Sequence, residues 1–401
     1  MKPPSLFLLA WACASPSLAL TLSLDEVASR ARTHHPALKA ARLAVEEARG
    51  RQLGAGRLAN PSLGYDFQNQ SNLSPQTGVV SLDQSFPLTR RLSLEKKLTS
   101  QMVVAAELEV RDSERRLVAE AKSQAVRLLT LSRQRQLRQQ QMDLAQKLAD
   151  FASDRAEAGE VSPLDARQVQ LDSQKLRIES RLLEAASVAV LGQLKPMLGL
   201  RSEEPLTLTG GLPTLELPPA SSWRQRPDYR LAQTKAEAAQ TGQQLARARR
   251  IPDVTAGLFG AHEMQDVTSA QRESTGFVGF RFSIPLPLWN RNQGEIAETA
   301  ASAERARLEA EALAVQIHGE AGTARREMET NASIVRETRE TLVPLAVQHS
   351  AEMEKAYKNG QTDLLSVLRS RDQRLQLESA ALDAERDFHL ARIRYEAATS
   401  H

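Results

Sequence analysis

Phe86-Pro87-Leu88 returns as Ile284-Pro285-Leu286 about 200 residues further along the chain, and this recurrence belongs to a duplication that decides the fold. Other pairs recur at nearly the same spacing: Pro36 with Pro227, Pro61 with Pro252, and Ala158-Gly159 with Asn359-Gly360. The spacing changes only where loops could take up insertions. We therefore expect two structurally equivalent halves that pack as pseudo-symmetric partners.

The sequence as a whole predicts four segments. Residues 1–19 are expected to be a signal peptide, and residues 199–222 connect the two repeats. The first repeat, 20–198, has a short helix, a β-hairpin at about 61–88 and a long helical hairpin at 92–198. The second repeat, 223–401, has the same parts, with the β-hairpin at about 252–286 and the helical hairpin at 292–399.

The composition favours long helices over a thick globular core. Aromatic residues make up only 4% of the 401 residues and hydrophobic residues 41%, while alanine, leucine, glutamate, glutamine and arginine are abundant. The 52 basic and 49 acidic residues are intermixed and give a net charge of +3. This balance gives no reason to expect a nucleic-acid partner.

The first residues have the pattern of an export signal. Lys2 precedes the apolar run 6–12, and Ser17-Leu18-Ala19 offers small residues for cleavage, so the mature chain would begin at Leu20. Lipidation of Cys13, the only cysteine, is the alternative. No later run of ~18 apolar residues predicts a membrane-spanning helix. Any part that enters a membrane would therefore have to be made of strands.

Each repeat contains two stretches in which apolar and polar residues alternate, the pattern of a strand with one oily and one wet face. The polar loops 68–77 and 262–274 separate them, which gives four strands. An ordinary half-buried sheet is one interpretation, but the neighbouring helices have few apolar residues to cover it. We expect lipid to cover the apolar residues, which are Leu63, Tyr65, Phe67, Val80, Leu82, Phe86, Val278, Phe280, Phe282 and Ile284. Four strands cannot close a barrel, so several chains would have to share one.

The longest elements follow the prolines at 87 and 285. Residues 92–158 contain neither proline nor glycine, and an unbroken helix of that length would extend about 100 Å. Its counterpart, 295–359, is interrupted only by Gly319, Gly322 and Pro344. A strand is conceivable at 206–208 in the connector. Coiled-coil seams are expected from Leu137, Leu144, Leu148 and Phe151 on the outgoing helix with Leu164, Leu171 and Ile178 on the returning one.

Each helical hairpin is expected to turn at a glycine. In Ala158-Gly159-Glu160-Val161-Ser162-Pro163-Leu164-Asp165, Gly159 ends one helix, Ser162 caps the next and Asp165 closes a pattern like a capping box. Gly360 and Thr362 would repeat this arrangement in the second half.

These parts, in this order, resemble the TolC-type outer-membrane efflux proteins over nearly the whole mature chain. The stretch 283–294, Ser-Ile-Pro-Leu-Pro-Leu-Trp-Asn-Arg-Asn-Gln-Gly, is similar to the strand-to-helix signature of the CzcC-like heavy-metal branch, and 158–165 is similar to its hairpin tip. The resemblance implies a mainly α fold with β: long antiparallel coiled-coil hairpins form a periplasmic tunnel, and three chains with four strands each share one transmembrane β-barrel.

The resemblance also implies partners and roles. A homotrimer in the outer membrane would be loaded by a periplasmic membrane-fusion adaptor and an inner-membrane proton-driven transporter, and would usually export divalent cations. The adaptor would contact the tips at Gly159, Val161, Ser162, Gly360 and Thr362.

The gate is where the chain departs from some relatives. Their acidic positions after the second tip glycine are Ser366 and Arg369 here, so an acidic ring at that level is in doubt. Asp165 is retained, and it could pair with Arg369 across the mouth or simply cap its helix. These three residues are our candidates for the periplasmic entrance.

We find no pattern that predicts an enzyme, a cofactor or a metal site. His34 and His35 are adjacent and therefore point about 100° apart on a helix, with no other ligands at metal-binding spacing. No phosphate loop or nucleophile motif is present. Two alternatives to metal export stay open: a channel for drugs or peptides, and a periplasmic adaptor or scaffold with no pore.

Overall fold

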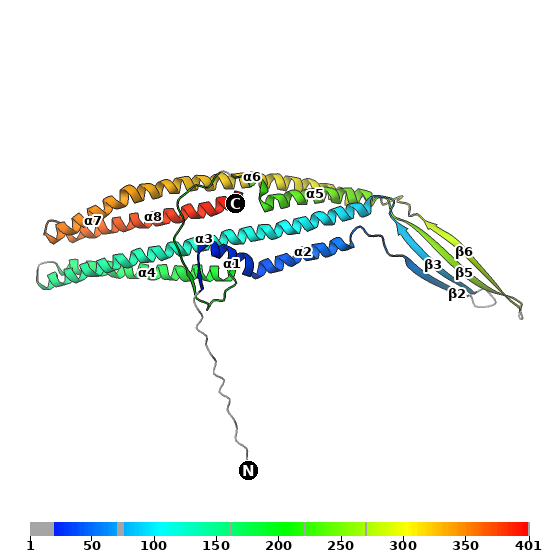
Figure 1. Cartoon of the computed structure of the whole chain (residues 1–401), viewed down its shortest axis with the longest axis horizontal. Helices are drawn as coiled ribbons and strands as arrows, with labels where there is room; N and C mark the ends of the chain where they lie inside the picture. The colour runs from blue at the N-terminus through cyan, green and yellow to red at the C-terminus, as the bar shows by residue number, and fades with distance from the viewer. Residues whose placement is uncertain (1–19, 70–75, 160–161, 220, 269–270, 400–401) are drawn as a thin grey trace, which may run out of the picture. The chain divides into compact units, whose positions relative to one another are not determined.

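A computed structural model describes residues 20–69, 76–159, 162–219, 221–268 and 271–399. The predicted signal peptide and Cys13 lie outside these ranges. Figure 1 labels the helices and strands. The chain divides into two compact units, and three helices contribute residues to both: α2 (Pro36–Gly54), α3 (Arg91–Glu157) and α6 (Gln293–Glu337). We call residues 1–39, 113–222 and 319–401 the helical unit, and residues 40–112 and 223–318 the strand unit.

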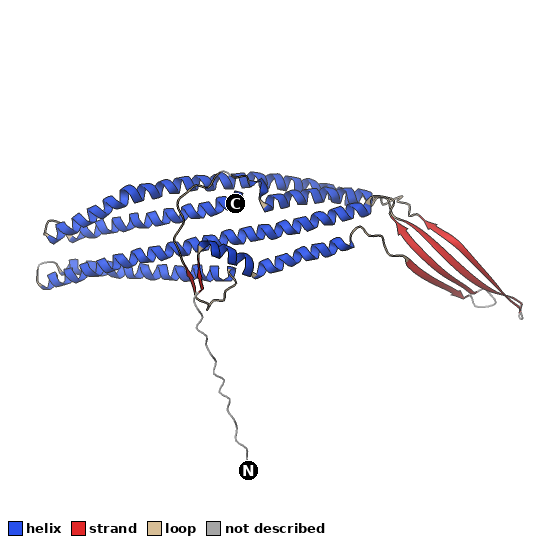
Figure 2. Ribbon diagram, viewed as in Figure 1, coloured by secondary structure: helices blue, strands red, loops and turns tan. Residues whose placement is uncertain are grey.

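The strand unit contains one antiparallel sheet of four strands in the order β2-β3-β5-β6 (Figure 2). The strands are β2 (Ser62–Asn69), β3 (Gln76–Phe86), β5 (Val254–Thr268) and β6 (Gln271–Ser283). The four predicted strands are thus confirmed. The loop predicted at 262–274 was wrong for most of its residues, because β5 extends to Thr268 and pairs with β6 from Gln271 onward.

The register of the sheet places nine of the ten predicted apolar residues on a single face. Leu63 lies opposite Leu82, Leu82 opposite Leu258, and Leu258 opposite Phe280, and every second residue along each strand shares that face. Val278 is 90% exposed and Phe280 88%. Ile284 follows directly after β6. The one-sided pattern is confirmed, while its contact with lipid stays a prediction.

The remaining elements of the strand unit are helical. They are most of α2 (Pro36–Gly54), the 3₁₀ turn η1 (Trp223–Gln225), α5 (Pro227–Ala248) and the first parts of α3 (Arg91–Glu157) and α6 (Gln293–Glu337). Arg91 of α3 forms an ion pair with Asp253, which directly precedes β5, at 2.6 Å. The prolines at the starts of α2 and α5 fit the first turn of a helix, where no N–H is required.

The helical unit is built from two long hairpins. One consists of α3 and α4 (Pro163–Met197); the other consists of α6, the π-helix η2 (Thr338–Leu342), α7 (Val343–Lys358) and α8 (Leu364–Thr399). The predicted helix 92–158 is confirmed within one residue at each end. In the second hairpin the interruption predicted at Pro344 is present, but α6 runs through Gly319 and Gly322 unbroken.

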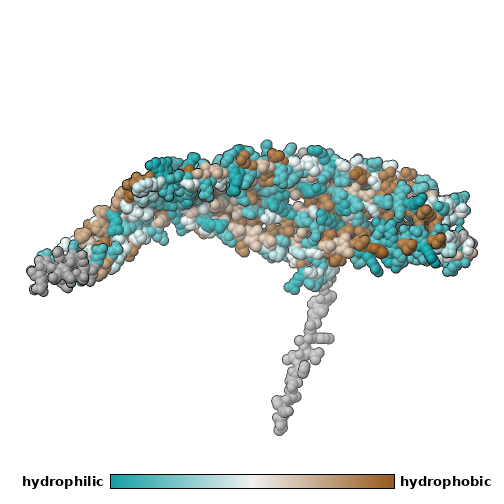
Figure 3. Space-filling view, turned by 180° about the vertical axis from the view of Figure 1, so that it is seen from behind, coloured by the Kyte–Doolittle hydropathy of each residue, from teal (hydrophilic) through white to brown (hydrophobic). Residues whose placement is uncertain are grey.

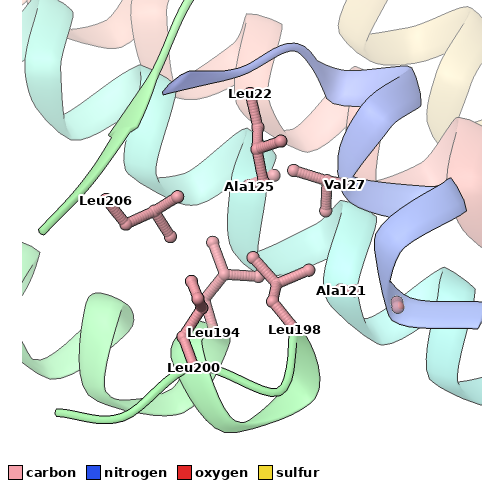
Figure 4. Close-up of a cluster of buried hydrophobic side chains, with 9 residues drawn as sticks. Leu22, Val27, Ala121, Ala125, Leu194, Leu198, Leu200 and Leu206 are labelled. Carbon is pink, nitrogen blue, oxygen red and sulfur yellow. The ribbon is translucent and has the colours of Figure 1, made fainter. Parts of the chain in front are cut away.

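A small mixed core stabilises the connector of the helical unit. The strand predicted at 206–208 is present as β4 (Leu206–Leu208), and it pairs in parallel with β1 (Leu20–Leu22), which the sequence did not reveal. Figure 4 shows Leu22, Val27, Ala121, Ala125, Leu194, Leu198, Leu200 and Leu206 converging from β1, α1 (Leu24–His34), α3, α4, the start of the connector and β4. At the start of α1, Ser23 and Glu26 form a capping box.

The coiled-coil seam of α4 differs from the prediction. Leu164, Leu171 and Ile178 are 73%, 66% and 60% exposed, and the buried positions are instead Ala166, Val169, Ser173 and Leu176. Two residues along a helix correspond to a turn of about 200°, so the leucines point away from α3. Hydrophobic side chains also lie among hydrophilic ones over the face seen in Figure 3. Within the described residues, no helix is long and apolar enough to span a membrane.

Candidate functional site

Both hairpins of the helical unit turn at a glycine, as predicted. Gly159 and Gly360 have φ of 73° and 72°, in the left-handed region that residues with a Cβ rarely adopt. The N–H of Gly360 donates to the Tyr357 carbonyl at 3.0 Å, and the N–H of Gln361 donates to the Ala356 carbonyl at 2.9 Å. These bonds satisfy the last carbonyl groups of α7.

The helices that return from the two tips are capped by different residues. Ser162 caps α4 as predicted, and its Oγ accepts a hydrogen bond from the N–H of Leu164 at 3.2 Å. Thr362 does not cap α8. Asp363 does, accepting from the N–H of Ser366 at 2.9 Å. The hydrogen bonds from Ser366 lower the pKa of Asp363 below its usual value. Val161 lies outside the described residues.

A hydrophobic cluster joins the two hairpins just behind their tips. It contains Leu148 and Ala152 of α3, Ala166 and Val169 of α4, Tyr357 of α7, and Leu364 and Val367 of α8. Phe151 meets the Tyr357 ring edge-on with 6.4 Å between centroids, and the Arg155 guanidinium lies 4.7 Å from the Phe151 ring centre. The tips are therefore held together by side-chain packing as well as by their turns.

Asp165, in the first turn of α4, affects the pKa of Tyr357. The Tyr357 hydroxyl is buried without a hydrogen-bond partner; burial raises its pKa, the Asp165 carboxylate raises it further, and Arg155 opposes both. Among the described residues of one chain, Asp165 and Arg369 form no ion pair. Arg369 is exposed and lies close enough to Asp363 to stabilise its charge, while Ser366 is half-buried.

Arg371 is a contact that the sequence did not reveal. It donates to Glu354 of α7 at 2.7 Å and to the Leu144 carbonyl of α3 at 3.3 Å, so one side chain of α8 ties together three helices. A cavity of about 270 Å³ lies beside it, with Phe151 and Tyr357 also in its wall. No sequence signal distinguishes Arg371 from the many other arginines on these helices.

His34 and His35, for which the sequence predicts no metal site, lie at the end of α1 and directly after it. His34 ends α1, and its Nδ1 lies 2.7 Å from the Thr33 hydroxyl. Within the described ranges, no group of three histidine, cysteine, aspartate or glutamate side chains could hold a metal ion.

Comparison with known proteins supports the resemblance. No family model matches the chain. The chain is 24% identical over 258 residues to the cobalt-zinc-cadmium resistance protein CzcC of Cupriavidus metallidurans, a match that covers 63% of this chain and only 57% of CzcC.

Solved structures match far more of the chain. The structure of CusC, a protein that forms a transmembrane channel, matches this chain with a TM-score of 0.78 at 15% identity. The match covers 95% of this chain and 92% of CusC. The outer-membrane channel OprN has a TM-score of 0.78 at 17% identity over 94% of this chain and 89% of its own. As the sequence motifs predicted, the chain has the fold of the TolC-type outer-membrane efflux channels.

Proposed function

We propose that the chain is the outer-membrane component of a tripartite efflux pump, a passive conduit from the periplasm to the exterior. The observation that carries this proposal is the sheet of the strand unit: nine of the ten apolar residues predicted from sequence lie along one face, and the sheet has two unpaired edges, β2 and β6. In lipid, an unpaired edge leaves backbone groups without hydrogen bonds, so the sheet has to be completed by other chains.

The strand order supports completion by copies of the same chain. Each strand is antiparallel to its neighbour, so β2 and β6 at the two edges run in opposite directions. β6 of one copy can therefore pair with β2 of the next in the same antiparallel manner, and the ring closes with any number of copies. Three copies would give a barrel of twelve strands, the number implied by the resemblance.

The tips of the helical unit would form the periplasmic entrance. We propose that the adaptor binds the turns at Gly159, Val161, Ser162, Gly360 and Thr362, and that the hairpins splay apart to admit cargo. Asp165, Ser366 and Arg369 would line this entrance. The energy would come from the proton-driven transporter in the inner membrane, so the conduit itself needs no catalytic group and no cofactor.

Divalent heavy-metal cations are the cargo that we favour. Support comes from the similarity to CzcC, whose name refers to cobalt, zinc and cadmium. Export of drugs or peptides is the alternative within the same class, and a periplasmic adaptor or scaffold without a pore is the alternative outside it.

Planar-bilayer recording of the detergent-purified protein tests the conduit. We expect a large, passive conductance, and a protein that forms no channel in any oligomeric state would be a scaffold instead. Tolerance of a deletion strain to zinc, cobalt and cadmium tests the cargo. Unchanged tolerance, with increased sensitivity to drugs, would replace metal export by drug export and leave the conduit intact.

A further inference from the structure

The charged side chains of the sheet are segregated onto one face. Within 62–68, 76–86, 254–264 and 273–283, no charged residue shares the apolar face of Leu63, Leu82, Leu258 and Phe280. The opposite face, which we call the wet face, carries all five, and four of them are acidic: Asp66, Asp83, Glu263, Glu273 and Arg281.

Arg281, the one basic residue of the wet face within these ranges, is held and neutralised. Its Nη1 lies 3.7 Å from Oδ2 of Asp83, and its guanidinium carbon lies 5.6 Å from the centre of the Phe259 ring. An ion pair cancels the charge of Arg281 at a distance, and the aromatic ring restrains its side chain.

Two glycines make room for this arrangement. A Cβ at Gly257 would lie 2.0 Å from Oδ1 of Asp83, and a Cβ at Gly279 would lie 2.7 Å from the edge of the Phe259 ring. Glycine weakens a strand unless another group must approach the backbone closely. At these two positions the approaching groups are the partners of Arg281, so the position of Arg281 is built into the sheet.

The remaining carboxylates have no such partner. Asp66, Glu263 and Glu273 are exposed or half-buried and form no ion pair with another described side chain. They do not form a single binding site, because the register spreads them along the strands: Asp66 lies opposite Val79, and Glu263 lies opposite Thr77. Their effect is that of a negative field over the whole wet face.

We infer that the wet face makes the barrel of the proposed conduit selective for cations, with Asp66, Glu263 and Glu273 setting the sign and Asp83 masking Arg281. This inference rests on the proposed function, in which copies of the sheet enclose a water-filled lumen. Acidic side chains around a lumen favour cations over anions. At the entrance, Ser366 and Arg369 stand where some relatives have acidic residues. The barrel carboxylates would thus provide the negative charge that the entrance lacks, which would suit a cationic cargo.

The reversal potential of the reconstituted full-length protein in a KCl gradient tests the inference. We expect a K⁺ to Cl⁻ permeability ratio well above one at low salt that falls as salt is raised, because ions screen exposed charges beyond about 10 Å at 0.1 M. The double variant Glu263→Gln/Glu273→Gln changes only surface side chains, and it should lower the ratio by at least about twofold.

Variants of the masked pair make the test sharper. Asp83→Asn should lower the ratio because it exposes the charge of Arg281, Arg281→Gln should raise it, and Asp83→Glu should keep it near the wild-type value. Val278→Ala, on the apolar face, is the matched control and should change nothing. The inference is wrong if the protein conducts with a K⁺ to Cl⁻ permeability ratio at or below one, or if the double variant has the same ratio as the wild type. Either result would leave the proposed conduit function intact. Absence of any conductance overturns both.

Discussion

At the scale of single residues, His389 gives the helical unit a dependence on pH. It is 3% exposed, its Nε2 has no hydrogen-bond partner, and burial lowers its pKa to about 4. Arg392 and Arg133 lower the pKa as well, whereas Glu385 raises it. In the unfolded chain this histidine would be protonated below about pH 6.5. Between pH 6.5 and about 4 it is therefore protonated in the unfolded state and still neutral in the folded state. We predict that stability falls as the pH drops through this window, by up to roughly 3 kcal/mol.

The apparent melting temperature of the detergent-purified protein measures this effect. His389→Leu removes the titrating group and should flatten the profile between pH 7 and pH 5. His34→Gln, at an exposed histidine, should leave the wild-type slope unchanged. A His389→Leu profile as steep as that of the wild type would assign the pH dependence to other groups.

The two tip glycines carry a second prediction at this scale. Gly360→Ala forces a Cβ into the left-handed region and should destabilise the hairpin by about 1–2 kcal/mol, while Gly360→Asn should cost less. Gly192→Ala is the matched control, because Gly192 lies inside α4 with no neighbour within 4 Å, and it should stabilise the protein. Comparing thermal unfolding of the three variants decides the point, and equal effects of Gly360→Ala and Gly192→Ala would contradict it.

At the scale of elements, the sequence predicted lengths well and faces less well. The helix α3 was predictable because residues 92–158 contain neither proline nor glycine, the two residue types that most disfavour a helix. The face of α4 was not, because several of its buried positions are small residues such as Ala166 and Ser173, while the larger aliphatic residues that suggested a seam point outward. At the tips, the glycines were predictable from their backbone requirement. Tyr357 and Arg371 were not, because their roles depend on contacts between helices that are distant in sequence. Asp363 was not either, because it stands next to Thr362, and both residue types can cap a helix.

The exposed stripe Leu164, Leu171 and Ile178 of α4 would be covered by another copy in the proposed trimer. We predict that Leu171→Ser/Ile178→Ser reduces the trimer fraction without unfolding the chain, because these side chains contact little within their own chain. Val169→Ser, at a fully buried position of the same helix, should instead destabilise the fold. Native mass spectrometry measures the trimer fraction and circular dichroism measures the helical fold, so together they distinguish the two results. A trimer fraction that the double variant leaves unchanged would mean that the stripe faces solvent or a different protein.

At the scale of the whole molecule, the two halves are equivalent in plan and different in detail. Both contribute two strands to the four-stranded sheet and one long helical hairpin, as the duplication predicted. The first half breaks its short helix at His35, between α1 and α2, whereas the second interrupts its long outgoing helix at the π-helix η2. Duplication fixes the order of elements, and local substitutions such as Pro344 then decide where each copy departs from the plan.

The sheet edges lead to the prediction that most directly tests assembly. If β6 of one copy pairs with β2 of the next, cysteines placed on these strands will cross-link copies of the mature chain, in which Cys13 would be absent. Asp66→Cys on β2, combined in turn with cysteine at Thr275, Phe277 or Arg281 on β6, should give covalent products of up to three chains in at least one combination. Each single variant should stop at two chains. Ser81→Cys on β3, used in place of the β2 cysteine, is the control and should not cross-link copies. β3 is already paired on both sides within its own chain, and Ser81 is 4% exposed. Products that exceed three chains, or a Ser81→Cys pair that cross-links equally well, would show that the edges do not close a ring of three.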